Sequence, residues 1–589
     1  MTAAHEDTDR PGPVGTTEAA PERTDHRSAA EIEADLASRL LRPGPTDRLW
    51  GWLGPLIVTA LAAVLRLVSL GHPTRLAFDE TYYVKQAYSL LTLGYEGEWE
   101  GENDEINARF REGDFSDLTS DPDYVVHPPL GKWLIAIGLR LFGADNGAGW
   151  RFSAAVAGAL TVLLLARLTR RLTGSTLLGC AAGLLLAVDG LHLTGSRIGL
   201  LDVFLGLFVI AALAAVLLDR EQSRRRLARA AAADLADRGD GRLTDPWGPR
   251  TGMRWWLVLA GVLLGLGGGV KWSAIYALAV FGILVVVWDL CARRAVGARL
   301  WFGAGVFRGG VPAFLALVPV AAVTYVAGWA SWFASPGAYL RTWAADQVAA
   351  TGTVERAWLP DALNSLWEYH LRAWDFHNGL DSEHTYEAHP AGWILQWRPT
   401  SFFWEGSVEA DCGADRCVQA ISSVGNPVVW WLGLVALVAV LWMAIARRDW
   451  RAWVALAGYA AVYLPWFAYA HRTIFTFYAI ALAPYVALAL VLAVAWVGGL
   501  LPPLHGPARR PGQLPDDDAA EPDDAWLTAT VEEDDDAVAP APGTRLGHVL
   551  LAVVCVAAVA ALVWFWPVWT GQTVSYDMWR ARMWLGSWI

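Results

Sequence analysis

Two adjacent carboxylates, Asp79 and Glu80, follow the first long apolar run of this sequence, within the segment "RLAFDETYYVKQAYSLL". Apolar residues recur at near-helical spacing from Phe78 to Leu91, which predicts an amphipathic helix in a membrane interface with both carboxylates at its start. The simplest interpretation is that the carboxylates stabilise the N-terminus of this helix through its dipole. The alternative is that they serve a function at the bilayer surface.

Cationic side chains lie near the same predicted membrane boundary. Lysine occurs only at Lys85, Lys132 and Lys271, whereas every other cationic position is arginine. Either a compact ammonium group is required at these three places, or the lysines survive by chance in a sequence of high-GC coding bias. Arg151 follows the glycine-rich segment "GADNGAGW" and opens the second apolar run. Its position favours a role in ligand binding.

Four further ionisable residues lie near the ends of predicted spans, namely Asp189, His192, Arg197 and Asp202. Ionisable groups close to a membrane core are costly, and they often mark a functional site. For three of them mutual pairing is the preferred interpretation, with Arg197 paired to Asp202 or Asp189. Such pairs would fix the packing of the helices.

Histidines gather in the segment "YHLRAWDFHNGLDSEHTYEAHPAGW", at His370, His377, His384 and His389. Their spacings match neither HExxH nor another compact zinc motif. The surrounding acidic and aromatic residues predict a surface that binds sugar or peptide, and a folded amphipathic loop is the alternative.

The composition is that of an integral membrane protein, because 55% of the 589 residues are hydrophobic, 34 are Trp and the mean hydropathy is +0.32. Apolar runs of about 20 residues, each long enough to span the hydrocarbon core as a helix, recur along the chain. They predict an all-α polytopic membrane protein with about eleven transmembrane helices. We place these spans at residues 50–70, 150–170, 175–193, 198–218, 255–270, 274–292, 309–329, 428–446, 452–469, 476–499 and 548–568.

Arginine-rich connections fall on one side of the predicted membrane, which the positive-inside rule makes cytoplasmic. The N-terminus is then inside and the C-terminus outside. The expected parts are a disordered cytoplasmic tail (1–48), a transmembrane catalytic domain (49–499) with outside segments 72–149 and 331–426, an acidic cytoplasmic linker (500–547), and a last span with an outside C-terminus (548–589).

Two cysteines, Cys412 and Cys417, fall in the second outside segment, where an oxidising compartment would allow a disulfide as readily as two free thiols. No nucleic-acid partner is expected. The formal net charge of −12 comes largely from polar stretches, so it says little about the active surface.

Short motifs occur along the chain in the order "FDE", "HPPLGKW", "RFSAA", "LLDVFLG", "GVKWSAIY", "HTYEAHPAGW" and "HRTIFTFY". This ordered set resembles the bacterial protein O-mannosyltransferases, in particular their actinobacterial branch, from about residue 50 to the last span. The resemblance implies a GT-C type glycosyltransferase of the plasma membrane. Its donor would be polyprenyl-phosphate mannose, and its acceptor a Ser or Thr hydroxyl of a secreted or translocating polypeptide. No cofactor is certain, and the use of a divalent cation is left open.

The resemblance also implies residue roles. Asp79 is expected to be the general base that takes the acceptor proton, and Glu80 to orient the acceptor or the base. Donor-phosphate contacts are expected from Arg151, Lys132 and Lys271. Acceptor or sugar contacts are expected from His127, His377, His384 and Tyr386.

The chemistry agrees with these roles. Displacing a phosphate from an anomeric carbon needs a base but no general acid, because the leaving phosphate is an anion that cations stabilise. A single displacement would invert the anomeric centre. Two alternatives stand beside this hypothesis: a related transferase that acts on a lipid or glycan acceptor, and a transporter. A transporter would carry charges in the middle of its spans rather than at their outer ends.

Overall fold

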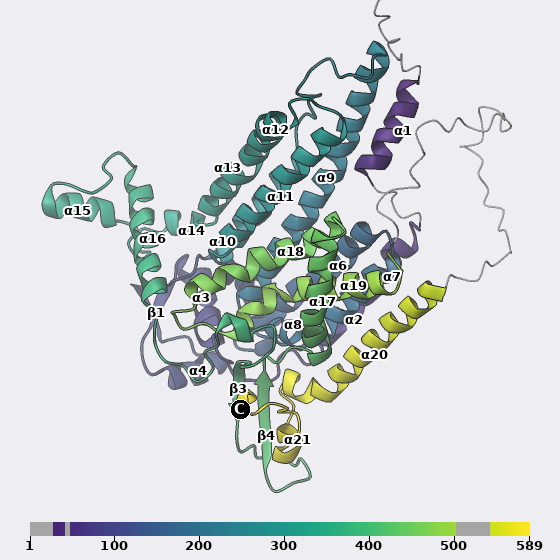
Figure 1. The fold of residues 1–589 in the computed structure, drawn as a ribbon. Helices are drawn as coiled ribbons and strands as arrows, with labels where there is room; N and C mark the ends of the chain where they lie inside the picture. Colours follow the sequence, from purple (N-terminus) through teal and green to yellow (C-terminus); the bar gives the residue numbers. More distant parts are fainter. Residues whose placement is uncertain (1–26, 42–46, 502–541) are drawn as a thin grey trace, which may run out of the picture.

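The computed structural model describes residues 27–41, 47–501 and 542–589, and most of them are helical (Figure 1). Eight helical segments are long and apolar enough to cross a membrane, and three shorter apolar helices accompany them. Each predicted span coincides with one of these segments, which confirms a polytopic helical membrane protein.

The long segments are α2 (Trp50–Leu67), α6 (Gly147–Thr173), α9 (Asp202–Arg238), α11 (Ala274–Ala295), α12 (Trp301–Ala304) continued by η1 (Gly305–Gly310) and α13 (Val311–Ala327), α17 (Pro427–Ile445), α18 (Trp450–Val462) continued by η3 (Leu464–Tyr469), and α20 (Pro542–Thr570). The shorter apolar helices are α7 (Thr176–Ala187), α10 (Trp255–Val270) and α19 (Ala483–Val497).

The two large connections fold into short helices and small sheets. The first holds α3 (Glu80–Leu93), β1 (Gly97–Trp99), α4 (Asn103–Arg111), β2 (Leu118–Pro122) and α5 (Leu130–Phe142). The second holds α14 (Ala330–Ala334), α15 (Trp343–Thr351), α16 (Asp361–Gly379), η2 (Pro390–Gly392), β3 (Ser401–Glu405) and β4 (Cys417–Ser422). Two short pieces complete the membrane part, namely α8 (Gly190–Gly195) and η4 (Thr476–Ala481), and a C-terminal segment follows α20.

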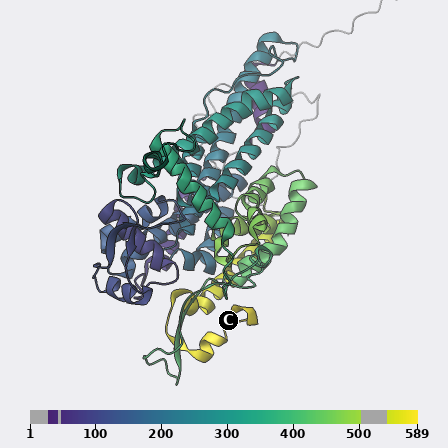
Figure 2. The same ribbon diagram turned by 90° about the vertical axis from the view of Figure 1, so that its left-hand side faces the viewer.

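Two small antiparallel sheets modify the all-α prediction. β1 pairs with β2, and β4 lies between β3 and the C-terminal strand β5 (Val574–Ser575), which is followed by α21 (Tyr576–Arg580) and η5 (Gly586–Trp588). β3, β4 and α21 project together from one end of the molecule, as the two views show (Figures 1 and 2). Cys412 and Cys417 form a disulfide in the turn between β3 and β4.

Close packing of α5 on α6 fixes the N-terminus of α6, where Arg151 lies. A Cβ atom on Gly138 would come within 2.2 Å of the Gly149 carbonyl oxygen, so the two helices can approach this closely only with glycine at position 138. Asn146 caps α6 by accepting hydrogen bonds from the backbone N–H groups of Ala148 and Gly149.

The C-terminal end of α2 is held by Arg197. Its guanidinium donates to the carbonyl oxygens of Leu65, Arg66, Val68 and Ser69. The prediction that Arg197 pairs with Asp202 or Asp189 is therefore wrong in its partners. Asp189 instead caps α8 and accepts from the indole of Trp430, and Asp202 pairs with Lys271.

The predicted disordered tail contains a helix, α1 (Ala29–Leu40), so the prediction is wrong for these residues. Ser28 and Glu31 form a capping box, and Ile32, Leu36 and Leu40 bury one face of α1 beside the far end of α9 (Figure 1). Their four-residue spacing is the helical signal that the polar composition of the segment obscured. Residues 1–26, and residues 502–541 of the predicted acidic linker, lie outside the described residues.

Candidate active site

Asp79 lies at the junction between the loop after α2 and the start of α3. It has helical backbone angles and makes no side-chain capping hydrogen bond, so capping does not account for this carboxylate. Phe78, just before it, has a φ of +51°, which is costly for an aromatic residue. Contacts between its ring and those of Phe402, Phe475 and Phe477 hold this conformation. The aromatic cluster thereby fixes where Asp79 points.

The surroundings of Asp79 suit a proton acceptor. Burial raises the pKa of Asp79 to about 6, and the nearby negative charge of Asp202 acts in the same direction. The positive charge of Lys271 and a hydrogen-bonding interaction with Tyr83, one helical turn along α3, oppose this rise. Asp79 is half-buried and part of its surface is open to solvent, so a substrate can reach it. A carboxyl group of this pKa is ionised at neutral pH and is a stronger base than an ordinary aspartate.

Glu80 points away from this opening into the protein, where it binds Arg151. Arg151 Nε lies 2.7 Å from Glu80 Oε1, Nη2 lies 2.8 Å from Oε2, and both side chains are fully buried. The same carboxylate accepts from the backbone N–H groups of Ala77 and Gly199. The remaining Arg151 N–H groups go to the carbonyl oxygens of Leu70, Pro73 and Arg75.

All five N–H groups of Arg151 are therefore used inside the protein. This geometry does not fit the expectation that Arg151 binds the donor phosphate, because no N–H group of its guanidinium is left for a phosphate oxygen. Likewise, Glu80 has no face turned toward an acceptor. Both residues hold the loop on which Asp79 is mounted.

The two expected lysines differ in their surroundings. Lys132 is fully buried and pairs with Glu96 at 2.6 Å, and it also donates to the His127 carbonyl oxygen. It therefore organises the loop before α5 and is not open to a phosphate. Lys271, at the C-terminal end of α10, donates to both oxygens of Asp202 at 2.8 and 2.9 Å, and its ammonium lies 5.0 Å from the Tyr478 ring centre.

Two histidines stack beside this ion pair. The rings of His127 and His377 are 5.3 Å apart, and the His377 ring also contacts Trp272. Burial lowers the pKa of His377 to about 4 and that of His127 well below its usual range, and the charge of Lys271 acts in the same direction on both. Both rings are neutral at physiological pH.

The tautomer of His377 follows from its contacts. Its Nε2 lies 2.9 Å from the Val126 carbonyl oxygen, so it donates the proton there. Nδ1 is then an acceptor, and it is buried with no hydrogen-bond partner among the described residues. A buried acceptor of this kind suits a sugar hydroxyl.

Arg472, in the loop between η3 and η4, supplies a cation that the sequence reasoning missed. Its half-buried guanidinium has no ion pair in the described part of the chain, and its buried Nε lacks a hydrogen-bond partner there. Its charge acts on His127, His377 and Tyr478 alike, which places it within the same cluster. It lies in the motif "HRTIFTFY", so a systematic survey of the charged residues in the motifs would have found it.

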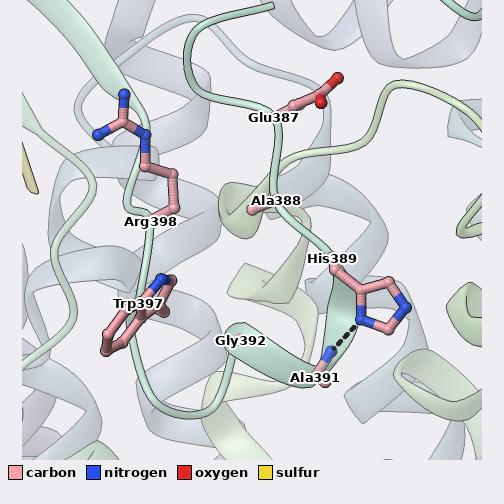
Figure 3. Close-up of a pocket in the computed structure, with 7 residues that line it drawn as sticks. All are labelled: Glu387, Ala388, His389, Ala391, Gly392, Trp397 and Arg398. Carbon is pink, nitrogen blue, oxygen red and sulfur yellow. Dashed lines mark hydrogen bonds between the residues drawn. The ribbon is translucent and has the colours of Figure 1, made fainter. Parts of the chain in front are cut away.

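His384 and Tyr386 lie at the rim of the site and not within it. His384 meets the edge of Phe475, and the Arg398 guanidinium lies over the Tyr386 ring. Beside them is a hollow of about 350 Å³ (Figure 3), lined by Glu387, Ala388, His389, Ala391, Gly392, Trp397 and Arg398. A β-bridge joins Glu387, in the lining of the hollow, to Phe475. The Phe475 ring contacts Phe78, the residue before Asp79, so the segment that contains Phe475 separates the hollow from Asp79.

The structure thus brings together Asp79, His127 and Lys271 from three of the motifs and His377 from the histidine-rich segment. Tyr83, Asp202, Tyr478 and Arg472 complete the cluster. Tyr83 could have been found from its helical spacing to Asp79. Among the described residues, no three His, Cys, Asp or Glu side chains are grouped so as to hold a metal ion, and the use of a divalent cation stays an expectation.

The fold resembles that of a solved membrane glycosyltransferase. The Saccharomyces cerevisiae protein O-mannosyltransferase Pmt1–Pmt2 complex bound to the sugar donor matches with a TM-score of 0.61 over 94% of each chain, at 14% sequence identity. At this identity the likeness concerns the fold alone. Together with the helical bundle it defines the class of the protein, a polytopic membrane protein with the GT-C fold.

Sequence comparisons give the family. Residues 126–233 match the family model of dolichyl-phosphate-mannose-protein mannosyltransferases, and residues 362–588 match the C-terminal four-transmembrane region of protein O-mannosyltransferases. Polyprenol-phosphate-mannose–protein mannosyltransferases of Mycolicibacterium smegmatis and Mycobacterium tuberculosis are each 36% identical to this chain over 92% of its length. The aligned regions cover 94% of the first protein and 93% of the second. The Corynebacterium glutamicum protein is 34% identical over 79% of this chain and 87% of that protein. The chain belongs to this family, and it is a protein O-mannosyltransferase that uses polyprenol-phosphate mannose.

Proposed function

We propose that the enzyme transfers mannose to Ser or Thr hydroxyl groups of secreted or translocating polypeptides at the outer face of the plasma membrane, by one inverting displacement with Asp79 as general base. The orientation rests on the arginine-rich connections, which favour a cytoplasmic location for the bundle end opposite Asp79. The N-terminus is then inside and the C-terminus outside.

In the reaction, the acceptor hydroxyl proton passes to a carboxylate oxygen of Asp79. The hydroxyl oxygen forms a bond to the anomeric carbon of mannose, and the bond from that carbon to the phosphate oxygen breaks. The electron pair leaves with the polyprenyl phosphate. The observation that carries this proposal is the Asp79 carboxylate, which is half-buried, makes no capping hydrogen bond to α3 and has its pKa raised to about 6.

Charge on the leaving phosphate must be stabilised. Arg472 is the best-placed group, because its guanidinium has no carboxylate partner in the described structure and a guanidinium can bind two phosphate oxygens. Lys271 contributes less net charge, since Asp202 neutralises it. We therefore propose Arg472 as the main phosphate contact, with Lys271 beside it, and we assign Arg151 and Lys132 structural roles.

The mannose ring needs partners for its hydroxyl groups. The unpartnered Nδ1 of His377 can accept one, and the neutral, half-buried His127 ring stacks beside it. We propose that these residues orient the sugar. The acceptor polypeptide would cross the rim at His384 and Tyr386, with the hollow in Figure 3 receiving its flanking residues.

A transfer assay tests the proposal. Purified enzyme is incubated with radiolabelled polyprenyl-phosphate mannose and, in parallel, with a Ser/Thr-rich peptide, a lipid acceptor or a mannan oligosaccharide. We expect label in the peptide alone, joined with an anomeric configuration opposite to that of the donor. Retention of configuration would overturn the single displacement, and labelling of the lipid or glycan in preference to the peptide would overturn the acceptor.

A further inference from the structure

A second hollow lies at the bundle end opposite Asp79, between the C-terminus of α6, the middle of α9 and the N-terminus of α10. It has a volume of about 610 Å³. We call it the basic groove, defined by Arg171, Arg225, Arg226, Arg229, Leu218 and Trp256. From the chemistry of these residues, we propose that the basic groove binds the headgroup of an anionic phospholipid.

Its depth relative to the membrane can be measured along two helices. Asp202 and Lys271 pair near the catalytic end, where α9 begins and α10 ends. Leu218 and Trp256 lie about 24 Å from that pair along α9 and α10, at about 1.5 Å per residue. This distance approaches the thickness of the hydrocarbon core, about 30 Å. The apolar edge of the groove therefore lies near the opposite membrane surface, and the arginines beyond it lie at headgroup level.

The charges in the groove are poorly balanced. Arg171 is bound by Glu221 with contacts of 2.6 and 2.7 Å, and Glu221 is the only acidic lining residue among those described. Arg225 lies 3.9 Å from the same carboxylate, and its side chain is 66% exposed. Arg229 reaches Glu33 of α1 only at 3.4 Å and is 80% exposed.

Arg225 and Arg229 are one helical turn apart, so their guanidinium groups lie on the same face of α9. Two exposed cations above an apolar edge match the structure of a phospholipid, whose phosphate lies next to its acyl chains. Exposed Trp255 and Met253, at the start of α10, are apolar surface beside the groove at the same level. Arginines at a membrane surface attract the negative headgroups of anionic lipids.

Native mass spectrometry of the full-length, delipidated enzyme in detergent tests this proposal. The probes are phosphatidylglycerol, cardiolipin and, as the neutral reference, phosphatidylcholine. The groove variant is Arg225→Gln/Arg229→Gln. The matched control is Arg447→Gln/Arg448→Gln, which removes two exposed arginines from the turn between α17 and α18.

We expect the wild type and the control to retain the two anionic lipids in preference to phosphatidylcholine, and the groove variant to bind them about 30-fold more weakly. Equal retention by the groove variant and the control would overturn the proposal. So would displacement of the lipid by equimolar inorganic phosphate, because the site would then recognise phosphate without a lipid. The transfer reaction is not part of this readout, so its outcome does not affect the test.

Discussion

Glu80 and Arg151 are neighbours in space although they belong to different helices, and they bind each other through two hydrogen bonds in a fully buried position. The pair also accepts from and donates to the backbone of the loop before α3 and of the segment before α9. Asp79, the residue next to Glu80, therefore stands on a rigid support. The acidic dipeptide divides two tasks between its members, since one carboxylate is open to substrate and the other anchors the loop.

Breaking this pair should damage the fold before it affects donor binding. Arg151→Ala leaves a buried carboxylate without its partner, which we expect to lower the free energy of unfolding by about 3–5 kcal/mol. Thermal unfolding in detergent measures the loss. The control is Arg75→Ala, which removes the exposed pair with Glu405 and should cost at most about 1 kcal/mol.

The milder change Arg151→Lys separates support from phosphate binding. Lysine can keep one contact to Glu80 but cannot reach the carbonyl oxygens as well. We expect a lower melting temperature with the donor KM unchanged in the protein that remains folded. A raised donor KM at an unchanged melting temperature would restore Arg151 to the donor site.

Asp79→Asn tests the base directly, because asparagine is almost the same size but cannot take the acceptor proton. We expect kcat to fall by about 10²- to 10⁴-fold while the protein still inserts and binds donor. Peptide mannosylation and donor binding are measured on the same preparation. Asp381→Asn, at an exposed position in the loop after α16, is the matched control. Near wild-type turnover in Asp79→Asn would exclude Asp79 as the base.

The spans could be predicted because a long apolar run depends on local composition, and each predicted span coincides with an apolar helical segment of the structure. Asp79, Lys271, His127 and His377 could be selected because their types and motifs were unusual. Partner choice could not be predicted, since it depends on contacts between distant segments. Arg151 meets Glu80 across 71 residues, and Lys132 meets Glu96 across a loop whose fold the sequence does not show.

The absence of a partner is as hard to predict from the sequence as its identity, as Arg472 shows. The chain contains 46 lysines and arginines, and their sequence context does not show which of them lack a partner. Only after the contacts of the described residues are assigned is Arg472 seen to be a cation of the cluster around Asp79 that has no carboxylate partner there.

The pH dependence of transfer should report the ionisation of Asp79. Because the base acts in its ionised form and its pKa is raised to about 6, kcat/KM for the peptide should fall as the pH drops below about 6. The charge of Lys271 holds this pKa down, so Lys271→Met should move the acidic limb to higher pH. A pH profile of kcat/KM, recorded at low peptide concentration for the wild type and for Lys271→Met, measures the acidic limb of each enzyme. An unmoved limb in Lys271→Met would contradict the assignment to Asp79.

Cysteine labelling tests the proposed orientation. In a variant whose free cysteines Cys180, Cys291 and Cys555 are replaced by alanine, single cysteines are introduced at the exposed positions Asp381 and Arg225. A membrane-impermeant maleimide should label Asp381→Cys on intact cells, and Arg225→Cys only after permeabilisation. Labelling of Arg225→Cys on intact cells would show that this part of the chain lies outside and would contradict the proposed orientation.

Arg472 offers the sharpest test of how the leaving phosphate is stabilised. Charge develops on the phosphate oxygens as the bond to mannose breaks, so a guanidinium contact there should lower the barrier more than it strengthens donor binding. We expect Arg472→Gln to reduce kcat by about 10²-fold, with a smaller change in donor KM, and Arg472→Lys to recover part of the loss. Arg416→Gln, an exposed arginine beside Tyr576, is the control and should keep wild-type kinetics. Steady-state kinetics with donor varied at saturating peptide measure both constants. Wild-type kcat in Arg472→Gln would mean that the phosphate is stabilised by Lys271 or by a group other than Arg472.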